Sequence, residues 1–241
     1  MNRQRLIQIA VIIMLLAVLI AGCTIPDSAV SQSQPQTTTQ TQPEKSSEKQ
    51  SRGNGTVELV KSPVQDGIYS MKLAIPANYT SGDAARVAVP LDEFTLSDIT
   101  SLSFWCYIDA DTPVNPEGYW VPYFTFEIDT DGEPGCDTWV IGGVGTVQQS
   151  TDMWFEINLE NDSLFHVAST VSNYESPFPI NKMGILTEIK VAVGPDGKTA
   201  LGDCPVSKIR LAIGNWGPGG PAGPVICYVD HLICNGEVLL K

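Results

Sequence analysis

Hydrophobic and polar residues alternate with a period of two along much of the chain beyond residue 55, and no useful window repeats every 3.6 residues. The alternating runs are rich in β-branched and aromatic residues, and clusters of Gly, Pro, Asp and Ser separate them, as is typical of strands joined by turns. A short helical turn is expected near Leu96–Ile99. The clearest strands are predicted at Ser101–Asp109, Tyr119–Asp129, Thr138–Ile141, Trp154–Leu159, Glu188–Val193, Lys208–Ile213 and Val225–Asn235, and weaker ones at Thr56–Val60, Ser70–Ile75 and Ala85–Pro90.

Such a series of strands predicts an all-β fold, a two-sheet antiparallel β-sandwich. Alternation assigns one face of each strand to the core. In two of the predicted strands the apolar sets are Leu102, Phe104, Cys106 and Ile108, and Trp120, Phe124, Phe126 and Ile128.

The opposite faces of these strands carry aromatic and polar side chains. If the strands adjoin, they form one outward surface that suits a sugar, because apolar C–H faces stack on rings and hydroxyls meet carboxylates. The alternative is that a loop, Pro113–Gly118, covers this face and turns it into a second small core. The predicted carbohydrate-binding residues are Trp105, Tyr107, Tyr123, Glu127 and Trp139.

The N-terminus has the order of an export signal. Arg3 and Arg5 precede an apolar run from Leu6 to Ala21, and small residues lead to Cys23. This arrangement resembles the lipobox of prokaryotic lipoproteins, which implies cleavage after residue 22, a lipid on Cys23 and export of the remainder. The alternative is an uncleaved transmembrane anchor, for which the run is at the short end. Both predict a membrane-attached domain on the extracytoplasmic side.

Composition divides the rest of the chain. Residues 23–55 are rich in Ser, Thr, Gln and Pro and hold little to bury, so we expect a disordered tether there and the β-sandwich domain over residues 56–241. The net charge of −13 disfavours nucleic acid as a partner, because an acidic surface repels phosphates.

Three segments then suggest a family. Asp66–Leu73 (DGIYSMKL), Leu96–Trp105 (LSDITSLSFW) and Cys227–Gly236 (CYVDHLICNG) resemble the opening, an early strand and the final strand of concanavalin-like and galactose-binding-like jelly rolls. The resemblance implies a jelly-roll fold like that of carbohydrate-binding modules. His231 stands where the second acid of the last strand is expected, which weakens the transfer of a calcium site.

Calcium is the one cofactor that the acidic residues suggest. Closely spaced carboxylates around a Gly turn suit this cation, and Asp129, Asp131 and Asp137 are one candidate set. A second set follows from the resemblance, since jelly rolls of this kind often bridge their first and last strands with calcium: Glu58 or Asp66 with Asp230. The alternative for the first set is an ordinary acidic turn.

The cysteines give a disulfide prediction. With Cys23 lipidated, five remain, and an odd number leaves at least one thiol free or bridged to another chain. Cys136 and Cys204 lie in Gly/Pro/Asp-rich loops and are the first choice for a disulfide. Paired CxxC spacing is absent from the sequence, which argues against a structural zinc site.

These features predict a surface lipoprotein that binds a polysaccharide or cell-envelope glycan without catalysis. No nucleophile elbow, HExxH motif or phosphate-binding glycine loop occurs in the sequence. Two alternatives stay open. One is a structural or adhesive protein whose sandwich binds another protein. The other is a divergent glycoside-active enzyme. Glu127 and Asp129, which share a strand face, come nearest to the pair of catalytic acids that such an enzyme needs.

Overall fold

The protein is described by a computed structural model that covers residues 47–78, 80, 82–114, 119–132, 136–143, 146–159, 163–169, 183–194, 197–214 and 223–240. Strands dominate these residues. They are β1 (Glu48–Arg52), β2 (Thr56–Val60), β3 (Ser70–Ile75), β4 (Ala84–Pro90), β5 (Leu102–Ile108), β6 (Tyr119–Trp120), β7 (Tyr123–Ile128), β8 (Thr138–Gly142), β9 (Thr146–Val147), β10 (Trp154–Leu159), β11 (Leu164–Ser169), β12 (Met183–Ile185), β13 (Val206–Gly214), β14 (Val225–Cys234) and β15 (Glu237–Leu240).

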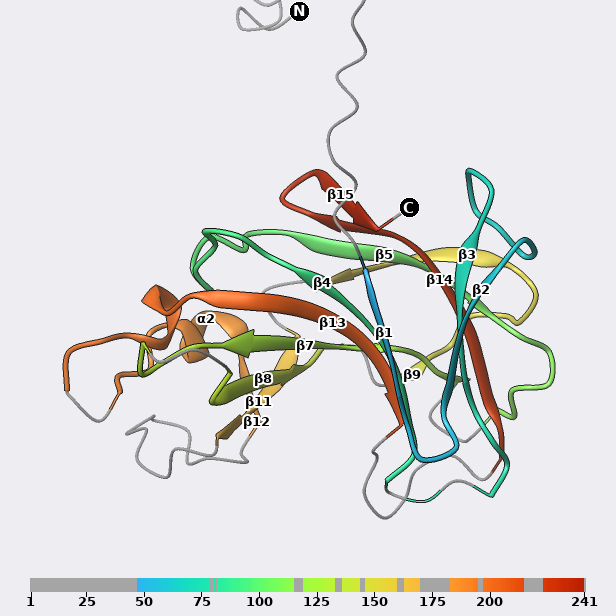
Figure 1. Cartoon of the computed structure of the whole chain (residues 1–241), viewed down its shortest axis with the longest axis horizontal. Helices are drawn as coiled ribbons and strands as arrows, with labels where there is room; N and C mark the ends of the chain where they lie inside the picture. The colour runs from blue at the N-terminus through green and yellow to red at the C-terminus, as the bar shows by residue number, and fades with distance from the viewer. Residues whose placement is uncertain are drawn as a thin grey trace, which may run out of the picture. The chain divides into compact units, whose positions relative to one another are not determined.

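The strands form two antiparallel sheets, as expected for a sandwich (Figure 1). The seven-stranded sheet has the order β1-β4-β13-β7-β8-β11-β12, and the six-stranded sheet has the order β10-β5-β14-β3-β2, with β15 paired to β14. Consecutive strands such as β3 and β4, or β4 and β5, belong to different sheets. The chain therefore crosses repeatedly between the layers, and neighbours in the sequence are often not neighbours in a sheet. The all-β sandwich prediction is confirmed.

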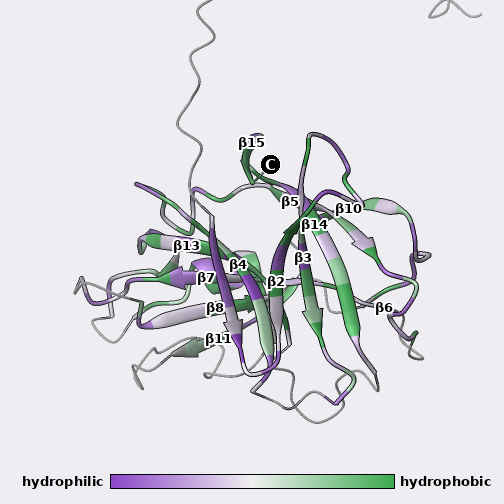
Figure 2. Ribbon diagram, turned by 45° about the vertical axis from the view of Figure 1, so that its right-hand side comes forward, coloured by the Kyte–Doolittle hydropathy of each residue, from purple (hydrophilic) through white to green (hydrophobic). Residues whose placement is uncertain are grey.

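The core lies between the sheets and is built from the apolar half of each alternating strand. Phe104 from β5 and Phe124 from β7 are fully buried and meet edge to face across the interface, with ring centroids 5.2 Å apart. Phe126 packs on Phe165 of β11 in the same core. The predicted inward sets are buried, except that Trp120 is only partly buried against the core. In Figure 2 the hydrophobic colouring is strongest along β14, which pairs with strands on both sides.

Two element predictions were wrong in part. The predicted strand Tyr119–Asp129 is interrupted at Val121 and Pro122, because proline cannot donate to a ladder. Its first two residues, β6, pair with β9 instead. The predicted strand Glu188–Val193 overlaps a short helix, α2 (Leu186–Lys190). Leu186 and Ile189 are its buried residues, and their spacing of three places them on one helical face.

The region near Leu96–Ile99 forms a hydrogen-bonded turn. The Asp98 carboxylate accepts from the N–H of Thr95 at 2.8 Å and from its hydroxyl at 2.7 Å. A further short element, the 3-10 helix η1 (Leu201–Asp203), precedes β13.

The predicted tether, residues 23–55, includes the first strand of the folded domain. Residues 48–52 form β1, which pairs with β4 over five residues and closes one edge of the seven-stranded sheet. This strand is almost entirely polar and exposed, which is why its composition resembles that of the preceding segment. An edge strand needs little apolar burial of its own, since its backbone hydrogen bonds attach it to the sheet. Cys23 and the rest of the predicted signal segment lie outside the described residues.

The predicted disulfide between Cys136 and Cys204 is not formed. The structure forms no disulfide among the five described cysteines. Cys136 bonds to the carbonyl of Thr138, whereas Cys204 lies in the core and bonds to the carbonyl of Ala200. Loop composition placed both residues near turns but carried no information on their separation. Burial, with a smaller contribution from Glu127, raises the pKa of Cys136 to about 11.

The described helices are short. None of them is long and apolar enough to cross a membrane, within the part of the chain that the structure describes.

Candidate functional site

The five residues predicted to bind carbohydrate do not share a surface. Trp105 and Tyr107 belong to β5 in the six-stranded sheet, while Tyr123, Glu127 and Trp139 belong to β7 and β8 in the seven-stranded sheet. Their outward directions were predicted correctly, but the two sheets turn these faces away from each other. The prediction that all five form one surface is therefore wrong, because the strands that carry them do not adjoin.

Register places the second group close together. Glu127 of β7 lies opposite Trp139 of β8 and Lys208 of β13, and Thr125 lies opposite Ile141 and Arg210. Residues directly opposite in an antiparallel pair project to the same side of the sheet. The outer face of the seven-stranded sheet thus joins aromatic, aliphatic and charged side chains across neighbouring strands.

This face contains a pocket of about 360 Å³. It draws on five adjacent strands, β1, β4, β13, β7 and β8, so the side chains that line it form one continuous patch. We call it the arginine pocket, and it is lined by Arg52, Arg86, Tyr123, Thr125, Trp139, Ile141 and Arg210. Three guanidinium groups therefore share a site with two aromatic rings. Among the described residues that line the pocket, arginine is the only charged type.

One of the arginines is neutralised within the protein. The Arg210 guanidinium forms an ion pair with Glu127, and the side chains are only 16% and 8% exposed. A shielded pair of this kind is costly to break on one side, because the remaining charge stays desolvated. The Nε of Arg210 is also buried and has no hydrogen-bond partner among the described residues. Glu127 therefore orders the pocket wall, although it was predicted as a sugar ligand.

Arg86 is held among other charges. Burial lowers the pKa of Arg86, and repulsion from Arg210 and Arg52 lowers it further, whereas Tyr123 and Glu127 oppose the effect. The group remains cationic, since an arginine starts from a very high pKa. The arrangement concentrates like charges at one place on the sheet.

Tyr123 is fixed at the end of the pocket. Its hydroxyl donates to the carbonyl of Gly214 at 3.0 Å, and burial raises its pKa. Gly214 ends β13 with φ at +91°, and a Cβ there would lie 2.3 Å from the carbonyl oxygen of Asp83. Only glycine fits this close approach. The sequence therefore fixes the backbone that holds the Tyr123 ring in place.

The outer face of the six-stranded sheet is built differently. Tyr107 contacts both Trp154 and Tyr228, with ring centroids 5.6 and 5.5 Å apart. The Tyr107 hydroxyl donates to Asp152 and the Tyr228 hydroxyl donates to Asp109, each at 3.1 Å. We call these three rings the tyrosine cluster. Its rings pack on one another and its hydroxyls already have acceptors.

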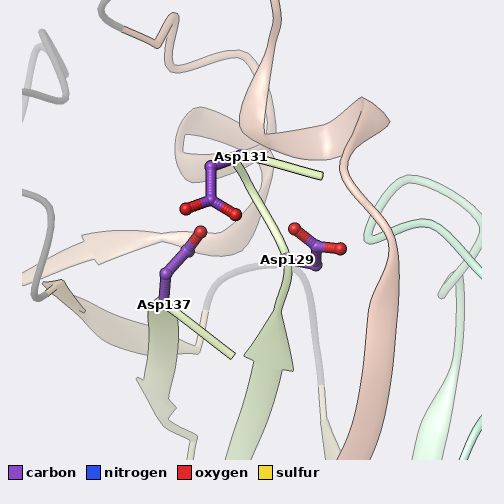
Figure 3. Close-up of side chains that lie close together, drawn as sticks. All are labelled: Asp129, Asp131 and Asp137. Carbon is purple, nitrogen blue, oxygen red and sulfur yellow. The ribbon is translucent and has the colours of Figure 1, made fainter. Parts of the chain in front are cut away.

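Three aspartates come together at one end of the seven-stranded sheet (Figure 3). The ligand oxygens of Asp129, Asp131 and Asp137 lie within 4.8 Å of one another, around the turn between β7 and β8. Some of these carboxylate oxygens already accept hydrogen bonds within the turn, since Asp137 accepts from the N–H and the hydroxyl of Thr130. Asp129 also accepts from the N–H of Gly132. The geometry fits both a cation site and a self-bonded acidic turn.

The second predicted calcium set pairs Glu58 or Asp66 with Asp230. These three residues do not form one group of ligand atoms within 4.8 Å, as the three aspartates above do among the described residues. Asp230 is buried and accepts from the N–H groups of Gln65 and His231. Asp66 accepts from the neighbouring Gly67. The carboxylate of Asp230 therefore fixes backbone next to β14, and a calcium ion that joins Asp230 to Glu58 or Asp66 stays a prediction.

The three arginines of the pocket were not predicted as site residues. After Arg5 the chain has only Arg52, Arg86 and Arg210, and all three line the pocket. Their rarity was visible in the sequence. Their convergence was not, because it needs β1 beside β4, about 36 residues away in the chain, and β4 beside β13, about 120 residues away.

Comparisons with known proteins add a likeness of fold. No family model matches the sequence, and no curated protein sequence matches it either. Solved structures do match, and carbohydrate-binding modules are prominent among them. The family 11 module of a cellulosomal cellulase of Clostridium thermocellum is 12% identical, with a TM-score of 0.41, and the match covers 78% of this chain and 87% of that one.

Two further structures give similar values. The same family 11 module in complex with a β-1,3-1,4-mixed-linked tetrasaccharide is 12% identical, with a TM-score of 0.42 and coverage of 78% and 88%. A xylan-binding domain, CBM22-1, from Paenibacillus barcinonensis is 8% identical, with a TM-score of 0.38 and coverage of 80% and 86%. No functional residue is transferred from such distant structures.

Proposed function

We propose that this protein binds carbohydrate without catalysis, and that the arginine pocket is the binding site. The observation that carries the proposal is the pocket itself: a hollow on a sheet face that combines partly exposed rings with fixed polar groups. Sugar sites need both, since rings stack on C–H faces and polar groups select hydroxyls. The tyrosine cluster offers rings whose faces and hydroxyls are already engaged.

The roles within the pocket follow from its contacts. Trp139 is the stacking residue, because it is partly exposed and lies beside Ile141 on the same strand. Tyr123 supplies a second ring, held by its bond to Gly214. Thr125 is nearly buried between Arg210 and Ile141 and offers a hydroxyl at the pocket floor. Glu127 holds Arg210 and does not serve as a general acid.

We further propose that the domain is exported and attached to a membrane through a lipid on Cys23. The support is the sequence order of two arginines, an apolar run and small residues before this cysteine. A glycan of the surrounding surface is the partner that this location suggests. Labelling with a radioactive fatty acid and its loss in Cys23→Ala test this proposal, and equal labelling of both proteins contradicts it.

A glycan array tests the binding proposal. The full-length protein in detergent is compared with Trp139→Ala, which removes the stacking ring, and with Trp105→Ala, the matched control on the other sheet. We expect one or more glycans to bind the wild type and Trp105→Ala. We expect Trp139→Ala to bind them about tenfold more weakly, because the loss of one ring contact costs about one to two kcal/mol of binding free energy.

Two results contradict the proposal. One is the absence of binding to any glycan on the array. The other is binding that survives Trp139→Ala and is lost in Trp105→Ala, which would place the site on the six-stranded sheet.

A further inference from the structure

The distribution of cationic side chains in this protein is uneven. The chain is acidic, with a net charge of −13, yet its only arginines after Arg5 meet in one pocket. They come from β1, β4 and β13, three strands that are adjacent in the sheet and distant in the sequence. The lysine on the same face, Lys208, is paired with Glu48 at 2.8 Å. Arginine, unlike lysine, presents a planar fork of donors that matches a carboxylate or a sulfate.

The positive charges of the pocket exceed the negative ones that face them. Glu127 neutralises Arg210, and Glu48 neutralises Lys208. Among the described residues no carboxylate lies within ion-pair distance of Arg52 or Arg86. Arg86 is half buried, and its neighbours Arg52 and Arg210 repel it. An arrangement of like charges that costs free energy in the empty pocket is relieved when an anion enters it.

Resting on the proposed function, we infer that the ligand of the arginine pocket is an acidic polysaccharide whose carboxylate or sulfate group binds between Arg52 and Arg86, while its sugar ring lies on Trp139. Both kinds of oxyanion accept two parallel hydrogen bonds from one guanidinium, which fixes orientation as well as charge. The Arg210–Glu127 pair closes the pocket wall beside them. Neutral sugars have no carboxylate or sulfate to pair with these two guanidinium groups.

The selectivity among acidic polymers follows from two electrostatic fields that act on the ligand. The acidic surface of the whole protein repels any polyanion at long range. The arginine pocket offers an opposite field, and burial partly desolvates Arg86, so its charge interacts more strongly than an exposed one. The protein should therefore ignore acidic polymers that cannot place an oxyanion in the pocket.

Matched polysaccharides test the inference. Binding of the full-length protein in detergent is measured by calorimetry to polygalacturonate, alginate, hyaluronate and dextran sulfate. The uncharged counterparts are fully methyl-esterified polygalacturonate and dextran. Comparing the carboxylate polymers with dextran sulfate separates the two oxyanions. The variants are Arg86→Gln, Arg52→Gln and, as the control, Lys72→Gln, which removes one cation from the six-stranded sheet.

We expect at least one acidic polymer to bind and its uncharged counterpart to bind at least tenfold more weakly. Arg86→Gln and Arg52→Gln should each weaken the acidic complex about tenfold, as for one lost hydrogen bond to a charged group. Lys72→Gln should leave it unchanged. Arg52 is exposed on an edge strand, so Arg52→Gln reports on binding even if Arg86→Gln folds poorly.

Three results overturn the inference. If neutral glycans bind, acidic ones do not and Trp139→Ala abolishes the binding, the carbohydrate site stands and its acidic specificity is wrong. If Lys72→Gln weakens binding as much as Arg86→Gln, the attraction is a general charge effect. If no polymer and no arrayed glycan binds, the proposed function fails together with the inference.

Discussion

The two outer faces of the sandwich both carry aromatic rings, but they use them in opposite ways. In the tyrosine cluster Tyr107 contacts two other rings, and aspartates accept from the tyrosine hydroxyls. In the arginine pocket Trp139 and Tyr123 border a hollow of about 360 Å³ among three guanidinium groups. This difference favours the arginine pocket as the proposed binding surface, because its rings border a hollow whereas those of the tyrosine cluster pack on one another.

The largest effect is expected from the ion pair of the arginine pocket. Glu127→Ala leaves Arg210 shielded from water without its carboxylate. We expect the free energy of unfolding to fall by about 3 kcal/mol, the lower part of the range for breaking a buried pair on one side. Urea denaturation of the purified protein measures it.

Lys208→Ala is the matched control for that experiment. It breaks the pair with Glu48 on the same face, whose side chains are 28% and 44% exposed. We expect a loss below about 1 kcal/mol, because water screens exposed pairs. Equal losses in the two variants would show that the Arg210–Glu127 pair is not shielded in the way described.

The second prediction concerns Tyr107→Ala in the tyrosine cluster. The change removes two ring contacts and one hydrogen bond. We expect a loss of about 1–3 kcal/mol in the free energy of unfolding and no change in glycan affinity. Trp139→Ala should give the reverse, with weaker glycan binding and a smaller loss of stability. Loss of glycan binding in folded Tyr107→Ala would erase the difference between the two faces.

A third test uses pH. Burial, followed by the hydrogen bond to Asp109, raises the pKa of Tyr228 to about 12. A raised pKa means that the folded state favours the neutral phenol, so the stabilisation is complete below about pH 10 and is lost as the pH rises toward 12. We expect the free energy of unfolding to decrease by roughly 1–2 kcal/mol over this window. In Tyr228→Phe this part of the decrease should be absent, and an unchanged profile would contradict the assignment.

The smallest effect is expected at the three aspartates between β7 and β8, where calcium binding stays a prediction. A cation that binds only the folded protein stabilises it by about 1.4 kcal/mol at ten times its dissociation constant. We expect millimolar calcium to raise the melting temperature by about 3–6 °C in the wild type and not in Asp131→Asn. A rise of the same size in both proteins would place the effect elsewhere.

Much of the architecture was predictable because alternation is a local property. Phe124 and Phe126 face the core, and Tyr123 and Glu127 face outward, as the period of two required. The helix α2 could not be predicted from periodicity, because its five residues are too few to show a helical period. Strand β1 could not be predicted from alternation, because an exposed edge strand has no alternating apolar residues.

The site was harder to predict, since it depends on strand order. Trp139 and Tyr123 were identified by their outward faces, but Trp105 and Tyr107 were grouped with them although β5 lies in the other sheet. Pairing of β1 with β4, and of β4 with β13, brings Arg52, Arg86 and Arg210 together, and no local pattern encodes these pairings. The same limit explains the wrong disulfide, which required the separation of two distant loops.

The central claim is that a glycan binds the outer face of the seven-stranded sheet. Its most direct test follows the indole N–H signals of the tryptophans by NMR while a glycan that the array selects is titrated into the protein. We expect the signal of Trp139 to shift in proportion to binding, while those of Trp105 and Trp154 stay in place. Shifts of Trp105 and Trp154 with an unmoved Trp139 would contradict it.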